Sequence, residues 1–244
     1  MIDNHIGFIG LGNVGSKLAN SILEAKYSLH VYDIDKNSST ELVNKGAKWE
    51  NSIKNLVNNS TLIITCLPSP QAVIDVVEKN SGMIEYIHNK HLWIEMSTTD
   101  EKEMIRLSKL IESKGAGVLE APVTGGQHKA ESGNISVLAA GKRANFDRAF
   151  PILSEIGFEV IFCGKIGNAS TLKVVTNYLA SINLLSIGEA FMVCKKYGID
   201  LRKAYQGIKI SSGNSFVHET ESQVILNGSY DVGFTMDLVC KDVG

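Results

Sequence analysis

The sequence has few of the features that mark disulfide-rich, metal-binding or nucleic-acid-binding proteins. Its four cysteines lie far apart, form no C-x-x-C pair and have no histidines at zinc-finger spacing; they are Cys66, Cys163, Cys194 and Cys240. We therefore expect free thiols in a reducing compartment and no metal site. The formal net charge is only -2, so no overall basic field attracts nucleic acid or anionic lipid.

The sequence also lacks an N-terminal signal and a long apolar run. Met1 to Asn4 carries an acidic residue where a signal peptide has a basic patch, and no apolar run approaches the length needed to cross a bilayer. These absences predict a cytoplasmic protein that binds small molecules, not nucleic acid or membrane. The 244 residues, 44% hydrophobic and 20% charged, have an ordinary globular composition and suffice for one or two domains.

Short apolar runs alternate with helical patterns over the first 164 residues. Apolar runs bounded by turn residues predict strands over 5–10, Leu29–Tyr32, Thr61–Cys66, Leu92–Glu95, Val118–Glu120, Ile135–Ala140 and Val160–Cys163. Apolar residues at helical spacing predict helices over Asn13–Ala25, Ser39–Lys45, about 100–114, and Asn145–Ile156. Such β-α units favour an α/β fold, with a mainly parallel, doubly wound sheet that helices cover on both faces.

After Gly164 the pattern becomes helical throughout. Asn168 to Tyr197 is typical of one long helix, Asp200 can cap another over Leu201–Ile208, and Phe234–Val239 starts one more. The sequence therefore predicts two domains, an α/β domain over residues 1–164 and an all-α domain over residues 165–244. Because the chain stops in mid-pattern at Gly244, we expect the second domain to be shortened at its C-terminal end.

A glycine pattern follows the first predicted strand and opens the first predicted helix. It comprises Gly10, Leu11, Gly12, Asn13, Val14 and Gly15, which match G-x-G-x-x-G. In this context the first glycine allows a tight turn, the second lets the backbone approach a pyrophosphate, and the third lets helix and strand pack closely. The pattern predicts a Rossmann domain with a dinucleotide on the helix N-terminus, although a purely structural glycine turn is the alternative.

Asp33 ends the second predicted strand, 18 residues after Gly15. A carboxylate at this place accepts hydrogen bonds from an adenosine ribose and repels a 2′-phosphate. Asp33 therefore favours NAD over NADP, while the nearby Lys36 weakens that preference. The alternative is that Asp33 and Asp35 are only turn residues.

Four further segments occur in a fixed order along the chain. They are residues 66–70 (Cys-Leu-Pro-Ser-Pro), 95–99 (Glu-Met-Ser-Thr-Thr), 120–126 (Glu-Ala-Pro-Val-Thr-Gly-Gly) and 164–177, in which Lys173 and Asn177 have K-x-x-x-N spacing. Together with the glycine pattern they resemble the β-hydroxyacid dehydrogenase family, which includes 3-hydroxyisobutyrate dehydrogenases and tartronate semialdehyde reductases. The resemblance spans the whole chain and implies a Rossmann domain followed by a helical domain.

The resemblance also implies which loops line the cofactor. The residues concerned are Leu67, Pro68, Ser97 and Thr98, with Lys241 reaching the nicotinamide side. Each has an ordinary structural alternative: Pro68 can simply end a strand, Ser97 or Thr98 can cap the next helix, and Lys241 can be a solvated charge near a terminus.

The substrate carboxylate is assigned by the resemblance to Thr124, Gly125 and Gly126. Two glycines let backbone N–H groups converge on an anion, and the hydroxyl adds an adjustable donor. Family members commonly have serine where this chain has Thr124, so the extra methyl group trims the pocket. An ordinary Gly-Gly turn is the alternative.

Lys173 is the general acid/base that the resemblance implies, and Asn177 orients the substrate from one helical turn later. Lysines on helices are usually solvated, but the apolar neighbours Leu172, Val174 and Val175 limit access of water here. A partly desolvated lysine is suited to moving a proton near neutral pH. The predicted reaction interconverts a small β-hydroxy acid and its semialdehyde or carbonyl form, with NAD carrying the hydride.

Three departures from the family pattern qualify this interpretation. Lys129 stands where the family has a small residue and Asn134 where it has threonine, so the outer wall of the pocket differs. The family's helical domain also continues beyond the Lys241–Asp242 pair, with helices that contribute to dimerisation. We expect a homodimer or higher homo-oligomer, since an apolar helix face without cover seeks a partner.

Two other functions compete with this prediction. A non-enzymatic NAD(P)-binding module would lack the catalytic lysine, which is present as Lys173. Related folds reduce imines or oxidise 6-phosphogluconate; the former generally lack the lysine and prefer NADP, and the latter need a basic phosphate site and a longer helical domain. Neither the lysine nor Asp33 suits an imine reductase.

Overall fold

The computed structural model describes residues 5–125, 134–229 and 239–240. The chain divides into two compact units, Met1–Lys173 and Val174–Gly244. The predicted domain boundary at Gly164 lies a little earlier, in the segment between the last strand and the long helix.

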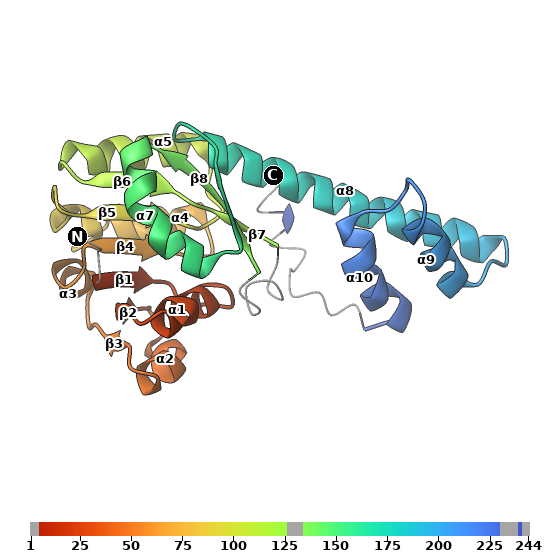
Figure 1. Cartoon of the computed structure of the whole chain (residues 1–244), viewed down its shortest axis with the longest axis horizontal. Helices are drawn as coiled ribbons and strands as arrows, with labels where there is room; N and C mark the ends of the chain where they lie inside the picture. The colour runs from red at the N-terminus through yellow and green to blue at the C-terminus, as the bar shows by residue number, and fades with distance from the viewer. Residues whose placement is uncertain (1–4, 126–133, 230–238, 241–244) are drawn as a thin grey trace. The chain divides into compact units, whose positions relative to one another are not determined.

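The first unit is built on one mixed sheet (Figure 1). Its strands are β1 (His5–Ile9), β2 (Ser28–Tyr32), β3 (Lys48–Trp49), β4 (Leu62–Thr65), β5 (Leu92–Glu95), β6 (Gly117–Glu120), β7 (Val123–Thr124), β8 (Ser136–Gly141) and β9 (Glu159–Phe162). The order is β3-β2-β1-β4-β5-β6-β8-β7, with β9 also paired to β8. The pairs from β3 to β6 are all parallel, and β8 is antiparallel to both β6 and β7. This confirms the predicted α/β fold, and the order 3-2-1-4-5-6 is that of a Rossmann domain.

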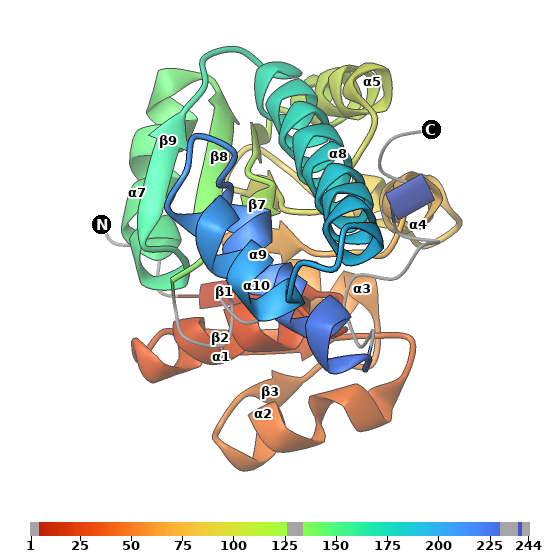
Figure 2. The same ribbon diagram turned by 90° about the vertical axis from the view of Figure 1, so that its right-hand side faces the viewer.

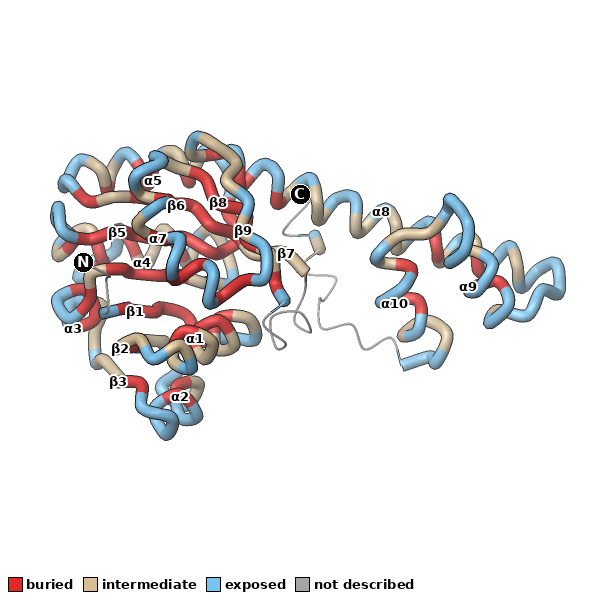
Figure 3. The backbone as a smooth tube through the Cα atoms, viewed as in Figure 1, coloured by how far each residue is buried: buried red, intermediate tan, exposed pale blue. Residues whose placement is uncertain are grey.

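Helices cover both faces of this sheet because successive strand residues point to opposite sides. Leu62 and Ile64 belong to the core under one face, whereas Ile63 and Trp93 belong to the core under the other. The first face carries α1 (Gly15–Glu24) and α7 (Arg143–Ile156), and the second carries α3 (Ile53–Asn58), α4 (Pro70–Glu78) and α5 (Glu101–Ser113) (Figures 1 and 2). Buried backbone is concentrated in the strands between these layers (Figure 3).

Several elements of this unit escaped the sequence analysis. Helices α3 and α4, strands β3 and β7, and the short helical segments η1 (Lys36–Ser39) and η2 (Met83–Glu85) were not predicted, and α2 is limited to Thr40–Asn44. The physical reason is clearest for α4, which begins at Pro70. Ser69 caps it by accepting a hydrogen bond from the Ala72 N–H (3.2 Å), and proline suits the first helical position. The sequence analysis treats this segment as a strand end and a cofactor loop, and it does not predict that a helix begins there.

The second unit is helical, as predicted. It contains most of α8 (Asn168–Lys196), followed by α9 (Leu201–Lys209) and α10 (Phe216–Asn227). Ile187 and Phe191 of α8 pack with Ala204 and Tyr205 of α9 in a small core. Helix α10 was not predicted, and the helix expected over Phe234–Val239 lies outside the described residues except for its last position.

Helix α8 corrects one expectation from the sequence. With 29 residues it is long and apolar enough to cross a membrane by length and composition, so the prediction that no apolar run approaches that length was wrong. Length and composition alone are weak evidence for a membrane span, because long helices of soluble proteins meet the same test. What α8 does present is an exposed apolar stripe, formed by Leu172, Val175, Tyr178, Leu179, Ile182 and Leu185. The expectation that Leu172 and Val175 limit the access of water to Lys173 was therefore wrong, because both side chains are themselves exposed.

Candidate active site

The predicted glycine turn joins β1 to α1, and two of its glycines are required by the protein's own packing. Gly10 has a φ of +97° and donates its N–H to the Tyr32 carbonyl (3.1 Å). A Cβ at Gly10 would lie 2.3 Å from the Cys66 carbonyl oxygen, and one at Gly15 would lie 2.1 Å from the Gly10 carbonyl oxygen. Neither position has room for any side chain.

Gly12 differs from its two neighbours in the pattern. A Cβ built at Gly12 meets nothing within 4 Å among the described residues. The fold therefore leaves open space at the one glycine whose predicted role is close approach to a pyrophosphate. This space and the adjacent N-terminus of α1 fit a dinucleotide.

Asp33 lies directly beside this turn. Its carboxylate accepts hydrogen bonds from the Leu11 N–H (2.6 Å) and the Asp35 N–H (2.9 Å). A carboxylate has about four acceptor positions, so Asp33 retains capacity for ribose hydroxyls. Ile34, the next residue, is 97% exposed, and the Lys36 ammonium lies 5.8 Å from the centre of the Trp49 ring.

A hydrogen bond joins the two loops that are predicted to line the cofactor. The Leu67 N–H, after β4, donates a hydrogen bond to the Ser97 hydroxyl, after β5 (2.8 Å). Ser97 is buried and does not cap α5. Asp100 does so by accepting from the N–H groups of Lys102 (2.9 Å) and Glu103 (3.1 Å). The capping alternative for Ser97 and Thr98 is therefore wrong.

The side chain of Glu95 supports these loops through hydrogen bonds, and the sequence analysis does not identify it as a site residue. This buried carboxyl ends β5, accepts from the Ser97 N–H (2.7 Å) and receives a hydrogen bond from the Thr65 hydroxyl. The Trp93 indole N–H in turn donates to the Thr65 oxygen (2.8 Å). Burial raises the pKa of Glu95 to about 7, against the opposing effect of its hydrogen bonds.

The predicted substrate segment begins as a short strand. Thr124 belongs to β7, pairs with Ser136 of β8 and is half-buried. Gly125 has a φ of +123°, which favours glycine. Gly126 lies outside the described residues, as does Lys241. The turn alternative for Thr124 does not describe it fully, because the residue forms part of a strand pair.

The predicted catalytic pair lies on α8. Lys173 is only 9% exposed, although a helical lysine is ordinarily solvated. Asn177, four residues later on the same helix, is half-buried. The first turn of α8 is bound by the buried Glu120 of β6, a residue that sequence reasoning did not single out. Among the described residues, no group of histidine, cysteine and acidic side chains could hold a metal ion.

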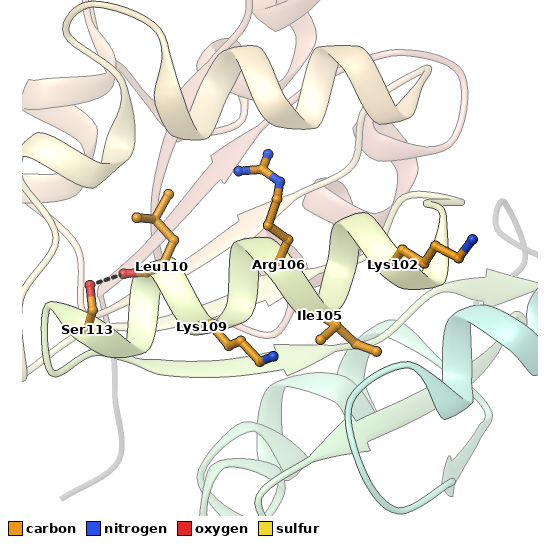
Figure 4. A pocket seen from close by; sticks show the side chains of 6 residues that line it. All are labelled: Lys102, Ile105, Arg106, Lys109, Leu110 and Ser113. Carbon is orange, nitrogen blue, oxygen red and sulfur yellow. Dashed lines mark hydrogen bonds between the residues drawn. The ribbon is translucent and has the colours of Figure 1, made fainter.

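A pocket elsewhere on the first unit contains none of these residues. It lies along α5 and is lined by Lys102, Ile105, Arg106, Lys109, Leu110 and Ser113 (Figure 4). Arg106 is engaged there by Glu78 (2.9 and 2.5 Å) and by Glu103 (2.9 Å). The pocket therefore offers no unpaired arginine to a ligand.

Comparison with known proteins connects both parts of the chain to one family. Residues 5–164 match the family model described as the NAD binding domain of 6-phosphogluconate dehydrogenase. Residues 167–244 match the model described as NAD-binding of NADP-dependent 3-hydroxyisobutyrate dehydrogenase. The chain belongs to the β-hydroxyacid dehydrogenase family. It is thus related to NAD(P)-dependent enzymes that act on a CH–OH group.

Individual relatives agree with this assignment of the dehydrogenase. The mitochondrial 3-hydroxyisobutyrate dehydrogenase of Rattus norvegicus is 30% identical over 246 residues, covering 98% of this chain and 73% of the relative. The 2-(hydroxymethyl)glutarate dehydrogenase of Eubacterium barkeri is 29% identical, covering 98% and 80%. Among solved structures, the 3-hydroxyisobutyrate dehydrogenase of Mycobacterium tuberculosis with L-serine has a TM-score of 0.90 and 25% identity, covering 99% and 84%.

The open space at Gly12 yields a first prediction for the dehydrogenase. Gly12→Ala should change the free energy of unfolding by less than about 0.5 kcal/mol and weaken NADH binding at least tenfold, because the new methyl group occupies the ligand's space. Gly15→Ala is the matched control and should destabilise the fold by roughly 1–3 kcal/mol, because its methyl group meets the Gly10 carbonyl. Urea unfolding and NADH fluorescence titration measure both quantities. Unchanged NADH affinity in Gly12→Ala would contradict the pyrophosphate assignment.

The buried carboxyl of Glu95 yields a second prediction. Its pKa is about 7 in the fold, against an ordinary value of 4.5. The stability contributed by the protonated form is therefore fully present below about pH 4.5, and it is lost as the pH rises through 7. Glu95→Gln resembles the protonated acid and cannot ionise. Between pH 4.5 and 8, the unfolding free energy of the native protein should fall relative to this variant by up to about 3 kcal/mol. Urea unfolding across this pH range checks it, and parallel curves would show that Glu95 titrates normally.

Proposed function

We propose that this dehydrogenase interconverts a small β-hydroxy acid resembling 3-hydroxyisobutyrate and its semialdehyde, with Lys173 as general acid/base. The observation that carries the proposal is the burial of Lys173 near the start of a helix bound directly to the sheet. The rat and Eubacterium barkeri relatives are a 3-hydroxyisobutyrate dehydrogenase and a 2-(hydroxymethyl)glutarate dehydrogenase, which supports this substrate class.

In the proposed reaction the residues of this chain bind, orient and move a proton. The Thr124 hydroxyl and the backbone N–H groups of Gly125 and Gly126 bind the substrate carboxylate. Asn177 orients the substrate by hydrogen bonds. Lys173 removes the proton of the substrate hydroxyl during oxidation and returns one to the carbonyl oxygen during reduction. The nicotinamide cofactor, when bound, accepts or donates the hydride.

The cofactor is held, in this proposal, along one edge of the sheet. The residues of the glycine turn, Gly10 to Gly15, bind the pyrophosphate, Asp33 binds the adenosine ribose, and Leu67, Pro68, Ser97, Thr98 and Lys241 line the remainder. We propose a preference for NAD because Asp33 repels a 2′-phosphate. The family description for residues 167–244 names an NADP-dependent enzyme, so this preference depends on Asp33 alone.

Homo-oligomerisation through the exposed stripe of α8 stays a prediction, which sedimentation of the whole chain would check.

Removal of the lysine tests the proposed chemistry. Lys173→Ala should lower kcat for 3-hydroxyisobutyrate or the best substrate of a short hydroxy-acid panel by roughly 10²–10⁴-fold, with NADH binding retained. The matched control is Lys195→Ala, which removes an exposed lysine near the end of the same helix and should leave kcat unchanged. Absorbance of NADH at steady state gives kcat. A Lys173→Ala enzyme with kcat within tenfold of the native value would show that another group moves the proton.

Neutralisation of Asp33 tests the cofactor preference. Asp33→Asn removes the charge but retains one acceptor oxygen for the backbone N–H groups of Leu11 or Asp35. The ratio of NADPH to NADH affinity should rise about tenfold, since the repulsion of the 2′-phosphate is removed. Asp35→Asn makes the same charge change two residues away and should alter the ratio much less. Equal changes in the two variants would indicate a general charge effect and overturn the role of Asp33.

A further inference from the structure

Glu120 connects the predicted substrate segment to the predicted catalytic helix. It is the last residue of β6 and is fully buried. One carboxylate oxygen accepts from the N–H groups of Gly167 (2.6 Å) and Ala169 (3.0 Å), and the other accepts from the Ser170 N–H (3.2 Å) and the Ser170 hydroxyl. A single side chain thus satisfies donors at the start of α8 that have no partner within the helix.

On the strand side, Glu120 is fixed close to Thr124. Only Ala121, Pro122 and Val123 separate the two residues, and each end of this link is held by backbone hydrogen bonds. The Ala121 N–H donates to the Glu95 carbonyl (2.6 Å), and the Leu138 N–H donates to the Pro122 carbonyl (3.0 Å). The position of Glu120 and that of Thr124 are therefore set by the same sheet.

On the helix side, Glu120 is fixed close to Lys173. Ser170, which donates two hydrogen bonds to Glu120, precedes Lys173 by three residues and so lies about one helical turn away. Gly167 enters the helix with a φ of +98°, so the chain turns sharply where Glu120 binds it. Glu120, Thr124 and Lys173 all belong to the same compact unit.

We propose that Glu120 is a positioning residue for the reaction, because it sets the place of Lys173 relative to the carboxylate-binding segment at Thr124 and Gly125. This rests on the proposed function, in which Lys173 exchanges a proton with the substrate. A misplacement of about 1 Å in a reacting group can lower the rate about 10²-fold. Loss of the anchor should therefore affect turnover more than binding.

The test compares kcat with cofactor binding in Glu120→Gln. The amide nitrogen that replaces one oxygen cannot accept hydrogen bonds, so the variant loses either the two from Ser170 or those from Gly167 and Ala169. We expect kcat for the hydroxy acid to fall about 10²-fold and NADH affinity to stay within twofold, because the glycine turn lies on other elements. Glu120→Asp, which keeps the charge on a shorter side chain, should recover part of kcat.

Two further variants keep the test decisive. Ser170→Ala removes only the hydroxyl donor and should give a smaller fall in kcat with the same unchanged NADH affinity; it decides the question if Glu120→Gln does not fold. Glu50→Gln is the control, because Glu50 is a partly buried carboxylate of the same unit that pairs with His30 (2.7 Å) outside the proposed site. Its kcat should equal that of the native enzyme.

The outcomes separate this inference from the proposed function. The inference is overturned if Glu120→Gln and Ser170→Ala keep kcat within twofold, or if kcat and NADH affinity fall together, as a general loss of structure would cause. If turnover survives in Lys173→Ala, the proposed function is wrong, whatever the result for Glu120→Gln. If Lys173→Ala is inactive and Glu120→Gln is fully active, only the positioning role of Glu120 is wrong.

Discussion

The contact between Glu120 and the first turn of α8 is the constraint that joins the carboxyl end of β6 to the start of this helix, and the proposed site depends on it. Helix α8 follows β9 in the chain, and Ala169 in its first turn packs against Leu138 and Ala140 of β8. The four hydrogen bonds that Glu120 accepts add a polar anchor to this apolar contact at the helix start. Because the positive end of the helix dipole meets a carboxylate there, the contact is favourable electrostatically as well as geometrically.

The parallel strands place the other residues of the proposed site at the same edge. The carboxyl ends of β1, β4, β5 and β6 are followed by the glycine turn, Leu67, Ser97 and the proposed substrate segment respectively. In an open α/β sheet this edge is where ligands bind. The hydrogen bond from Leu67 to Ser97 and the contacts of Glu95 make neighbouring loops depend on one another.

Local patterns predicted much of this fold, whereas the supporting contacts escaped prediction. The strand–glycine–helix pattern around Gly10 and the long helix from Asn168 are signals carried by adjacent residues, and the structure has both elements. Glu95 and Glu120 act through partners 30 and 50 residues away. No spacing rule identifies such partners, because the strand order brings them together. Ser97 shows the same limit: its residue type predicts a cap, but its partner is Leu67 on a neighbouring loop.

Glu95 and Glu120 are also direct neighbours across the β5–β6 pair, which explains part of the energetics of this edge. Burial raises the pKa of both carboxyls, and the charge of Glu120 adds to the effect at Glu95. Apolar residues at these positions would avoid that desolvation, but they would leave the N–H groups of Ser97, Gly167 and Ala169 without their acceptors. Unsatisfied buried donors each cost about 1–3 kcal/mol. The two buried acids therefore accept hydrogen bonds from the loop after β5 and from the first turn of α8. Their desolvation lowers the stability of the fold, by an amount that depends on pH.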